Sequence, residues 1–326
     1  MSNKKKIIIC YTPFHLFCVN LFIDKLLNVN KGSFLLYIGP SNNQSEYYLN
    51  NLSNHIEVQT IKTNMNKFIN CIKIVLLMIK IPNKKDFNEV FCANYKVIYS
   101  RIVLYFMSKQ TDFYKFDDGV GEILQKSWFQ QPENIFLRLI LKFFEPKLSY
   151  KNLKNLPRAF TIYQQLKSED TILLEFPHLN IRSSSEKHNK VILLGQDYSR
   201  NNGLMTAKEE EWLYEHAIEK FDVDEFIPHP LSMLNNKGLI AKVLHPDQIA
   251  EEYIYSQLNS YNCNVIGFRT SAVFNCKIFF NKHIESDRLT LTNLTVCRNN
   301  LPISETWVKD IWTSNFLNLN INLKKK

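Results

Sequence analysis

Glycine is scarce in this sequence, with 8 residues in 326, which excludes collagen-like repeats and glycine-rich disorder. Long apolar runs are absent too: residues 74–79 form the most apolar stretch and lysines bound it, whereas a spanning helix needs about 20 apolar residues. No GxGxxG or Walker loop occurs. The apolar run after Lys4–Lys6 is too short for a signal peptide. We therefore expect a cytoplasmic protein.

The seven cysteines are odd in number and contain no CxxC pair. Most of them lie inside apolar runs, as in IIICY and EVFCAN. This pattern indicates buried free thiols in a reducing compartment, rather than a disulfide framework or a zinc site.

Basic residues outnumber acidic residues by 40 to 31, a net charge of +9. This excess favours an acidic partner: nucleic acid, a membrane face or a phosphorylated small molecule. Lys4–Lys6 and Lys324–Lys326 are typical of solvated tails, with attraction to anionic lipid as the alternative. The other lysines are dispersed and no nucleic-acid-binding motif is present, so we expect no nucleic acid partner.

The N-terminal half alternates apolar, β-rich runs with helical patterns. Helices of 10–17 residues between such strands predict a doubly wound parallel sheet in an α/β protein. Thr12 and Pro13 are suited to begin the helix after the first strand. The expected strands are 6–11, 33–38, 57–62, 89–93 and 111–116, and the clearest expected helices are 65–81 and 95–108.

Residues 145–190 differ from the rest, since they hold several prolines and a Ser-Ser-Ser run. We interpret them as a connection between two lobes. The α/β pattern then restarts with strands 190–194, 225–227, 263–267 and 277–280, helices 207–220 and 246–259, and a closing helix 304–319. The sequence therefore predicts two Rossmann-like lobes, 1–175 (with the connection 145–190) and 186–326.

Ligands of parallel sheets bind beyond the carboxyl ends of the strands, so the residues that follow strands are the site candidates. Asp117, Asp118 and Gly119 follow strand 111–116. Adjacent carboxylates repel, so one of them is suited to accept a proton, and Gly119 permits a turn that projects them. A strand-ending turn with an aspartate helix cap explains the same residues equally well.

Pro228, His229 and Pro230 follow a strand of the second lobe. The prolines restrict the backbone around an imidazole that is able to donate a proton to a phosphate leaving group. A loop histidine with a structural hydrogen bond is the alternative. The dipeptide is not specific in itself, because His245 and Pro246 also form one, in a connector before a helix.

Gly267, Thr270 and Ser271 lie where a strand gives way to a helix. Hydroxyls and free N–H groups at a helix N-terminus bind anions, although a plain helix cap is the alternative. Glu251 and Glu252, on the preceding helix, suit both hydroxyls of a ribose, unless they face solvent as most helical glutamates do.

Gly195, Gln196 and Asp197 follow strand 190–194, and Asp197 is a second candidate for a catalytic carboxylate. Asp222 and Asp224 fit the DxD pattern that binds divalent metal in many sugar transferases. They precede strand 225–227 and lie at the opposite edge of the sheet from these candidates, so we predict no metal site there.

The segments FDDG (116–119), PHP (228–230) and GFRTS (267–271) resemble the D/E-D/E-G, His-Pro and Ser/Thr motifs shared by several bacterial sialyltransferase families. CYTPFHLF (10–17) and LLGQDYS (193–199) are most similar to glycosyltransferase family 52, which includes lipooligosaccharide and capsule sialyltransferases. The resemblance covers most of the chain through these short segments. It implies a GT-B fold, with two Rossmann-like lobes whose parallel sheets face a central cleft.

The same resemblance implies inverting, metal-independent transfer of sialic acid from CMP-sialic acid to a terminal galactoside of a bacterial surface glycan, with no cofactor. Asp118 would deprotonate the acceptor, with Asp197 as the alternative base, and His229 would donate to the departing phosphate. The other expected donor-site residues are Gly195, Gln196, Pro228, Pro230, Glu251, Glu252, Gly267, Thr270 and Ser271.

Two other functions are left open: a GT-B transferase that uses another nucleotide sugar, for example for glucosyl transfer, and a non-catalytic nucleotide- or glycan-binding protein. Two partners are also left open. One is a second copy of the chain, through 145–190 or 304–319, and the other is peripheral contact with the inner membrane.

Overall fold

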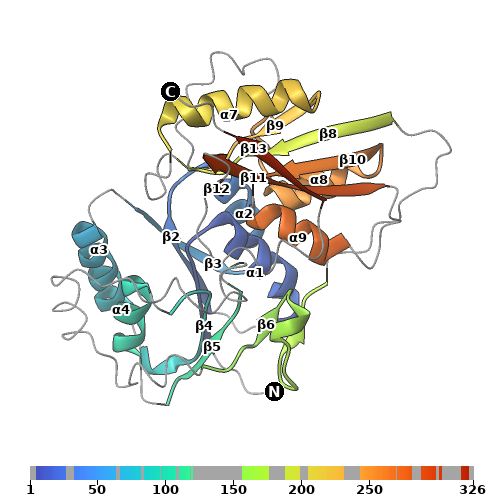
Figure 1. The fold of residues 1–326 in the computed structure, drawn as a ribbon. Helices are drawn as coiled ribbons and strands as arrows, with labels where there is room; N and C mark the ends of the chain where they lie inside the picture. Colours follow the sequence, from blue (N-terminus) through green and yellow to red (C-terminus); the bar gives the residue numbers. More distant parts are fainter. Residues whose placement is uncertain are drawn as a thin grey trace. The chain divides into compact units, whose positions relative to one another are not determined.

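A computed structural model gives the fold, and it separates into two compact units, Met1–Phe176 and Pro177–Lys326 (Figure 1). Each unit is described by itself. The residues that the structure describes are 5–26, 33–63, 67–81, 84–95, 97–107, 110–117, 119, 156–175, 188–198, 205–230, 243–268, 270–280, 288–298, 301–302 and 317–322.

The first unit is built on a parallel sheet with the strand order β3-β2-β1-β4-β5. All four residues from Ile7 to Cys10 are buried, because helices cover both faces of the sheet. The strands are β1 (Lys5–Cys10), β2 (Phe34–Gly39), β3 (Glu57–Lys62), β4 (Phe87–Cys92) and β5 (Asp112–Lys115). The prediction of a doubly wound parallel sheet in this half is confirmed.

Four α-helices connect these strands: α1 (Pro13–Leu26), α2 (Asn43–Ser53), α3 (Lys67–Lys80) and α4 (Ile98–Phe106). The N–H of His15 donates to Thr12 Oγ1 over 3.3 Å, so Thr12 caps α1 as expected. Helices α3 and α4 pack together and cover the sheet face that carries Ile7 and Ile9. A short 3-10 turn, η1 (Lys84–Asp86), precedes β4.

Residues 156–175 belong with the first unit, since Lys115 and Arg158 form a parallel bridge next to β5. This stretch contains a small parallel pair, β6 (Phe160–Thr161) with β7 (Ile172–Leu173), and the 3-10 turn η4 (Gln164–Leu166). Its first residues therefore lie beside the carboxyl end of β5, where their backbone forms hydrogen bonds with Lys115.

The second unit repeats the architecture with the strand order β12-β11-β10-β8-β9, and β13 pairs with β11. Its strands are β8 (His188–Leu194), β9 (Glu225–Ile227), β10 (Tyr261–Gly267), β11 (Leu289–Arg298), β12 (Leu301–Pro302) and β13 (Leu317–Asn322). Its helices are α7 (Ala207–Lys220), α8 (Ala250–Gln257) and α9 (Ser271–Phe280). Every pairing is parallel except that of β12, so the α/β prediction is confirmed here too.

Two sequence predictions in the second unit are wrong. Residues 277–280 belong to α9 and not to a strand, because the apolar run KIFF continues the buried side of that helix. The expected closing helix 304–319 fails at its end, because Leu317–Asn322 form β13. Leucine or isoleucine alternates with asparagine along this segment, which is the period of a strand. Residues 303–316 lie outside the part that the structure describes.

Among the side chains that the structure describes, six cysteines are buried and form no disulfide, as the sequence predicts: Cys10, Cys18, Cys71, Cys92, Cys263 and Cys276. Burial raises the pKa of the Cys10 and Cys276 thiols well above the usual value. These thiols therefore stay protonated and act as small apolar side chains.

Candidate active site

Three strands of the second unit end at the same level. In the pairing register, Leu194 of β8 lies opposite Gly267 of β10 on one side and Ile227 of β9 on the other. Neighbouring strands are about 4.8 Å apart, so the three ends span roughly 10 Å. Three candidate segments begin one residue later, namely 195–197, 228–230 and 268–271. The sheet thus gathers these segments at one carboxyl edge.

Gly195 lies directly against the His-Pro segment. Its N–H donates to the carbonyl of Ile227 over 2.8 Å. A Cβ at this position would lie 3.1 Å from both the His229 nitrogen and the Pro228 Cα. Glycine therefore allows two backbones to approach closely here, and a larger residue would push them apart by a few tenths of an ångström; the half-buried His229 lies next to the loop that follows β8.

The N-terminus of α9 forms the third side of this edge. Thr270 is buried, and its Oγ1 accepts the N–H of Val273 over 3.2 Å, so the hydroxyl caps the helix. Ser271, the first helical residue, is exposed. A Cβ on Gly267 would lie 2.4 Å from Val273 Cγ2, so only glycine lets the helix begin this close to β10. The helix cap that the sequence left open as the alternative is therefore present, and it uses one of the N-terminal N–H groups; the others of the first turn are the ones suited to an anion.

The sequence reasoning missed the side chains that hold the loop after β8. The phenol of Tyr214, on α7, accepts the Gln196 N–H over 2.7 Å and donates to the Gln196 carbonyl. Glu210, one turn earlier, accepts the Tyr198 N–H over 3.1 Å, and the Tyr198 phenol donates to the Phe268 carbonyl over 2.8 Å. The signal in the sequence is the four-residue spacing of Glu210 and Tyr214, which places both side chains on one face of α7.

Burial determines the protonation state of Tyr214 and the accessibility of the loop beside it. Burial, and after it the nearby Glu210, raises the pKa of Tyr214 well above its usual value, so its phenol remains a neutral donor and acceptor. Asp197 in the same loop is 3% exposed, and Gln196 is half-buried. The loop that carries the second candidate base is therefore held in place by hydrogen bonds to α7.

Glu251 lies in the first turn of α8, but its side chain turns inward. Asn275 of α9 donates its amide to Glu251 Oε1 over 2.7 Å, and the carboxyl is 5% exposed. Burial raises the pKa of Glu251, while the Asn275 hydrogen bond opposes that rise. Glu252 is half-buried, so of the two expected ribose ligands it is the more accessible.

The DxD pair lies at the other end of β9. Asp224 Oδ2 accepts the N–H of Val191 over 2.7 Å, and Asp222 adopts a left-handed backbone with a φ of 48° where the chain leaves α7. The three residues of β9, which span roughly 10 Å, lie between this pair and the Pro228-His229-Pro230 segment. The Asp224 carboxylate therefore binds the backbone of β8 next to the start of β9.

In the first unit, the two aspartates after β5 are not equivalent. Asp117 is 1% exposed and accepts three hydrogen bonds: from Arg158 Nη1 over 2.6 Å, from Thr161 Oγ1 over 2.8 Å and from the Ile162 N–H over 2.5 Å. These bonds fasten residues 158–162 to the end of β5. Asp117 thus has a structural role, although its partners are residues 158–162 and not the N-terminus of a following helix.

Asp118 lies outside the described residues. Gly119 has a φ of +94°, and a Cβ there would meet nothing within 4 Å. This φ strains any residue other than glycine, so Gly119 uses the conformational freedom that the expected turn requires, while the turn itself stays a prediction.

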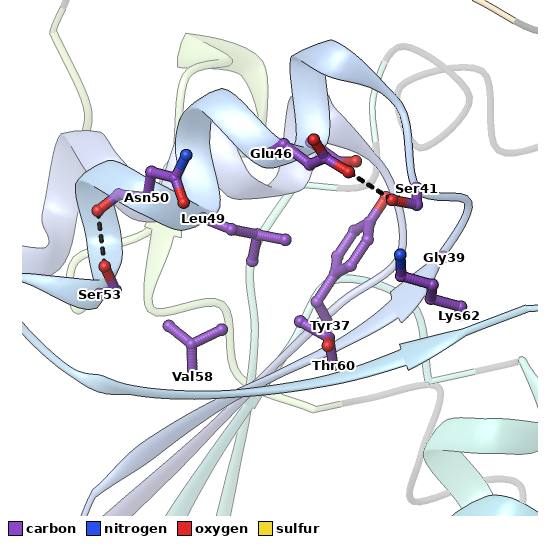
Figure 2. Close-up of a pocket in the computed structure, with 11 residues that line it drawn as sticks. Tyr37, Gly39, Ser41, Glu46, Leu49, Asn50, Ser53, Val58, Thr60 and Lys62 are labelled. Atoms are coloured by element: carbon purple, nitrogen blue, oxygen red, sulfur yellow. Dashed lines mark hydrogen bonds between the residues drawn. The ribbon is translucent and has the colours of Figure 1, made fainter.

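A polar groove of about 260 Å³ lies in the first unit between α2 and β3, the outer strand of the sheet (Figure 2). Val58, Thr60 and Lys62 alternate along β3 and therefore share one face. The facing side of α2 contributes residues at helical spacing. The lining residues are Tyr37, Gly39, Ser41, Ser45, Glu46, Leu49, Asn50, Ser53, Val58, Thr60 and Lys62.

Hydrogen bonds shape the closed end of this groove. The Tyr37 phenol donates to the Pro40 carbonyl over 3.0 Å, and Ser41 donates to Glu46 Oε1 over 2.6 Å. A Cβ on Gly39 would lie 2.6 Å from the backbone carbonyl oxygen of Tyr11, so glycine is needed at the end of β2. Most of the lining residues thus carry a hydroxyl, amide, carboxylate or ammonium group, while the larger share of the groove's exposed surface is apolar.

Sequence comparisons relate this chain to known glycosyltransferases. The family model of glycosyltransferase family 52 matches residues 33–290. A CMP-N-acetylneuraminate:beta-galactoside alpha-2,3-sialyltransferase of Pasteurella multocida (strain Pm70) is 26% identical over 282 residues, which are 82% of this chain and 86% of that protein.

Solved structures resemble the fold at low sequence identity. The UDP-GlcNAc 2-epimerase of Methanocaldococcus jannaschii superposes with a TM-score of 0.50 at 12% identity and covers 98% of this chain and 89% of its own. The UDP-N-acetylglucosamine 2-epimerase of Rickettsia bellii gives a TM-score of 0.50 at 13% identity, over 91% and 80%. The likeness shows the fold alone, and it confirms the expected GT-B type with Rossmann-like lobes.

Proposed function

This chain belongs to glycosyltransferase family 52, and we propose that it transfers sialic acid from CMP-sialic acid to a terminal galactoside of a bacterial surface glycan. The observation that carries the proposal is the shared level of Leu194, Ile227 and Gly267, which brings a histidine and a helix N-terminus to one sheet edge. The 26% identical sialyltransferase of Pasteurella multocida supports the choice of donor and of a galactoside acceptor.

The phosphate of the donor is assigned to the second unit. The N–H groups at the start of α9 and the hydroxyls of Thr270 and Ser271 hold the phosphate oxygens, and His229 donates a proton to the phosphate as it leaves. Sialic acid is linked through a single phosphate, so the departing CMP carries less clustered charge than a nucleoside diphosphate. An imidazole and a helix N-terminus are able to stabilise that charge without a metal ion.

The rest of the donor site follows from the neighbouring loops. Glu252, with the deeper Glu251, binds the ribose hydroxyls, because both lie in the first turn of α8. Gly195 and Gln196 contribute backbone groups beside His229. Pro228 and Pro230 restrict the histidine backbone.

The transfer itself is an inverting substitution. The acceptor hydroxyl oxygen bonds to the anomeric carbon while the bond from that carbon to the phosphate oxygen breaks, through an oxocarbenium-like transition state. Asp118 takes the hydroxyl proton, since its neighbour Asp117 is held by Arg158, Thr161 and Ile162. Asp197 is the alternative base. CMP leaves with the bonding electron pair, and no cofactor is consumed.

The polar groove between α2 and β3 is assigned to the acceptor glycan. Asn50, Thr60 and Lys62 line it with exposed side chains that suit the hydroxyls of a sugar. Its strand-end residues lie on β2 and β3, three and four strands away from β5, or roughly 15–20 Å across the sheet. It therefore suits a sugar several units from the reacting end.

His229→Ala tests the proposal, with His245→Ala as a matched control from the exposed His-Pro dipeptide. Loss of the proton donor is expected to lower kcat roughly 10²- to 10⁴-fold without changing the thermal unfolding midpoint. The control should keep full activity. A fully active His229→Ala enzyme would remove the assignment.

A nucleotide panel tests the donor independently of turnover. CMP should raise the unfolding temperature, whereas UDP and GDP should not. Stabilisation by UDP alone would favour a transferase for another nucleotide sugar. Activity should also persist in excess EDTA, and complete loss there would reinstate Asp222 and Asp224 as a metal site.

A further inference from the structure

Helix α3 leaves a stripe of large apolar side chains in contact with solvent. Five of its residues are between 41% and 59% exposed, namely Phe68, Ile69, Ile72, Leu76 and Ile79. The opposite side of the same helix is buried against the sheet through Cys71, Ile74 and Met78. A single exposed leucine needs no explanation, but a contiguous apolar surface marks an interaction site.

The stripe is continuous along the helix. Phe68, Ile72, Leu76 and Ile79 follow one another at three- or four-residue intervals, so they lie one above the other over roughly 17 Å. Helix α4 packs beside α3 (Figure 1) and adds Tyr105, which is 40% exposed. The exposed apolar strip of α3 therefore lies beside a second helix that also exposes an aromatic side chain.

Along the sequence, the charged residues of α3 and of the segments next to it have one sign. Between Glu57 and Asp86 the sequence contains no acidic residue but five lysines beyond Lys62, namely Lys67, Lys73, Lys80, Lys84 and Lys85. Lys73, Lys80 and Lys85 are exposed. An apolar strip flanked by lysines is the pattern of a helix that lies in the headgroup region of an anionic bilayer.

We propose that α3 docks this protein on the surface of an anionic membrane, with the apolar strip in the headgroup region and the lysines on lipid phosphates. A second copy of the chain suits the same surface less well, because a two-fold interface would bring the two sets of lysines together. No helix in the described ranges is long and apolar enough to cross a bilayer. The inference rests on α3 alone and does not depend on the proposed function.

The test is sedimentation of the full chain with phosphatidylcholine vesicles that either contain or lack phosphatidylglycerol. The wild type should sediment only with the anionic vesicles, and salt should weaken this binding. The double variant Ile72→Ser/Leu76→Ser should bind about tenfold or more weakly. Its unfolding temperature should stay close to that of the wild type, because both side chains are exposed.

Two matched controls separate α3 from other causes. Ile172→Ser removes an equally exposed isoleucine, 44% exposed, from another part of the first unit and should leave binding unchanged. Replacing Lys324–Lys326 with glutamine should weaken binding far less than the α3 variant does. Three results would overturn the proposal: no binding by the wild type, loss of binding in the tail variant alone, or a wild-type dimer in light scattering that the α3 variant turns into a monomer.

Discussion

Replacing Asp117 with asparagine should destabilise the protein strongly without impairing the chemistry. The carboxylate and the Arg158 guanidinium form a buried pair, with exposed side-chain fractions of 0% and 8%. Breaking such a pair from one side costs about 3–5 kcal/mol, because the other charge stays buried without its partner. That is a large share of the roughly 5–15 kcal/mol that stabilises a typical fold.

Urea unfolding followed by circular dichroism measures the effect. Asp117→Asn should lower the free energy of unfolding by about 3–5 kcal/mol, while kcat per folded molecule changes little. Asp118→Asn should instead lower kcat and change the free energy of unfolding little, since we assign Asp118 to proton transfer. The double variant Asp117→Asn/Arg158→Gln should lose less free energy of unfolding than the two single variants lose together, and the difference should be about 0.5–3 kcal/mol. An unchanged urea midpoint for Asp117→Asn would refute the structural role of this carboxylate.

Three further predictions concern the second unit. Gly267→Ala should displace α9, lower the free energy of unfolding by about 1–3 kcal/mol and weaken CMP binding in calorimetry. Adding Val273→Ala to this variant should restore much of the stability and of the CMP affinity. No recovery would mean that the contact between these two residues is not the cause. Burial raises the pKa of Glu251 above 4.5, so the folded state holds that proton more tightly and the wild type loses stability as pH rises through the interval above 4.5. Glu251→Gln, which still accepts from Asn275, should therefore unfold at higher urea than the wild type at neutral pH and at similar urea below pH 4.5, and parallel pH profiles would contradict this. Tyr214→Phe removes both hydrogen bonds to the loop after β8, so it should cost about 1–3 kcal/mol and raise KM for the donor; kinetics with an unchanged KM would disprove the loop's role.

The sequence predicts most strands of both units well, because a buried parallel strand is a continuous apolar run and little else in a chain looks like one. The run KIFF at 277–280 misled for the same reason, since α9 is buried too and a short apolar run does not distinguish a strand from a buried helix. Helix α2, with the polar sequence NQSEYYLNNLS, carries no strong apolar period, so it went unpredicted.

The site could be predicted only in part, because its geometry depends on pairings between distant residues. Strand ends identify 195–197, 228–230 and 267–271 as candidates, but only the register brings them to one level. The sequence cannot tell Asp117 from Asp118, since the partner that distinguishes Asp117 is Arg158, 41 residues away. The contacts of Tyr214 and Asn275 likewise join elements that the sequence leaves separate.

Mass spectrometry of the reaction products tests the central claim most directly. The full chain is incubated with CMP-sialic acid and a lactose-type acceptor, and the His229→Ala variant serves as the control. The account predicts an acceptor that gains the mass of one sialyl residue, together with released CMP, and a rate of formation of both products that is roughly 10²- to 10⁴-fold lower with the variant. An unchanged acceptor here, with sugar transfer from a UDP donor instead, would contradict it.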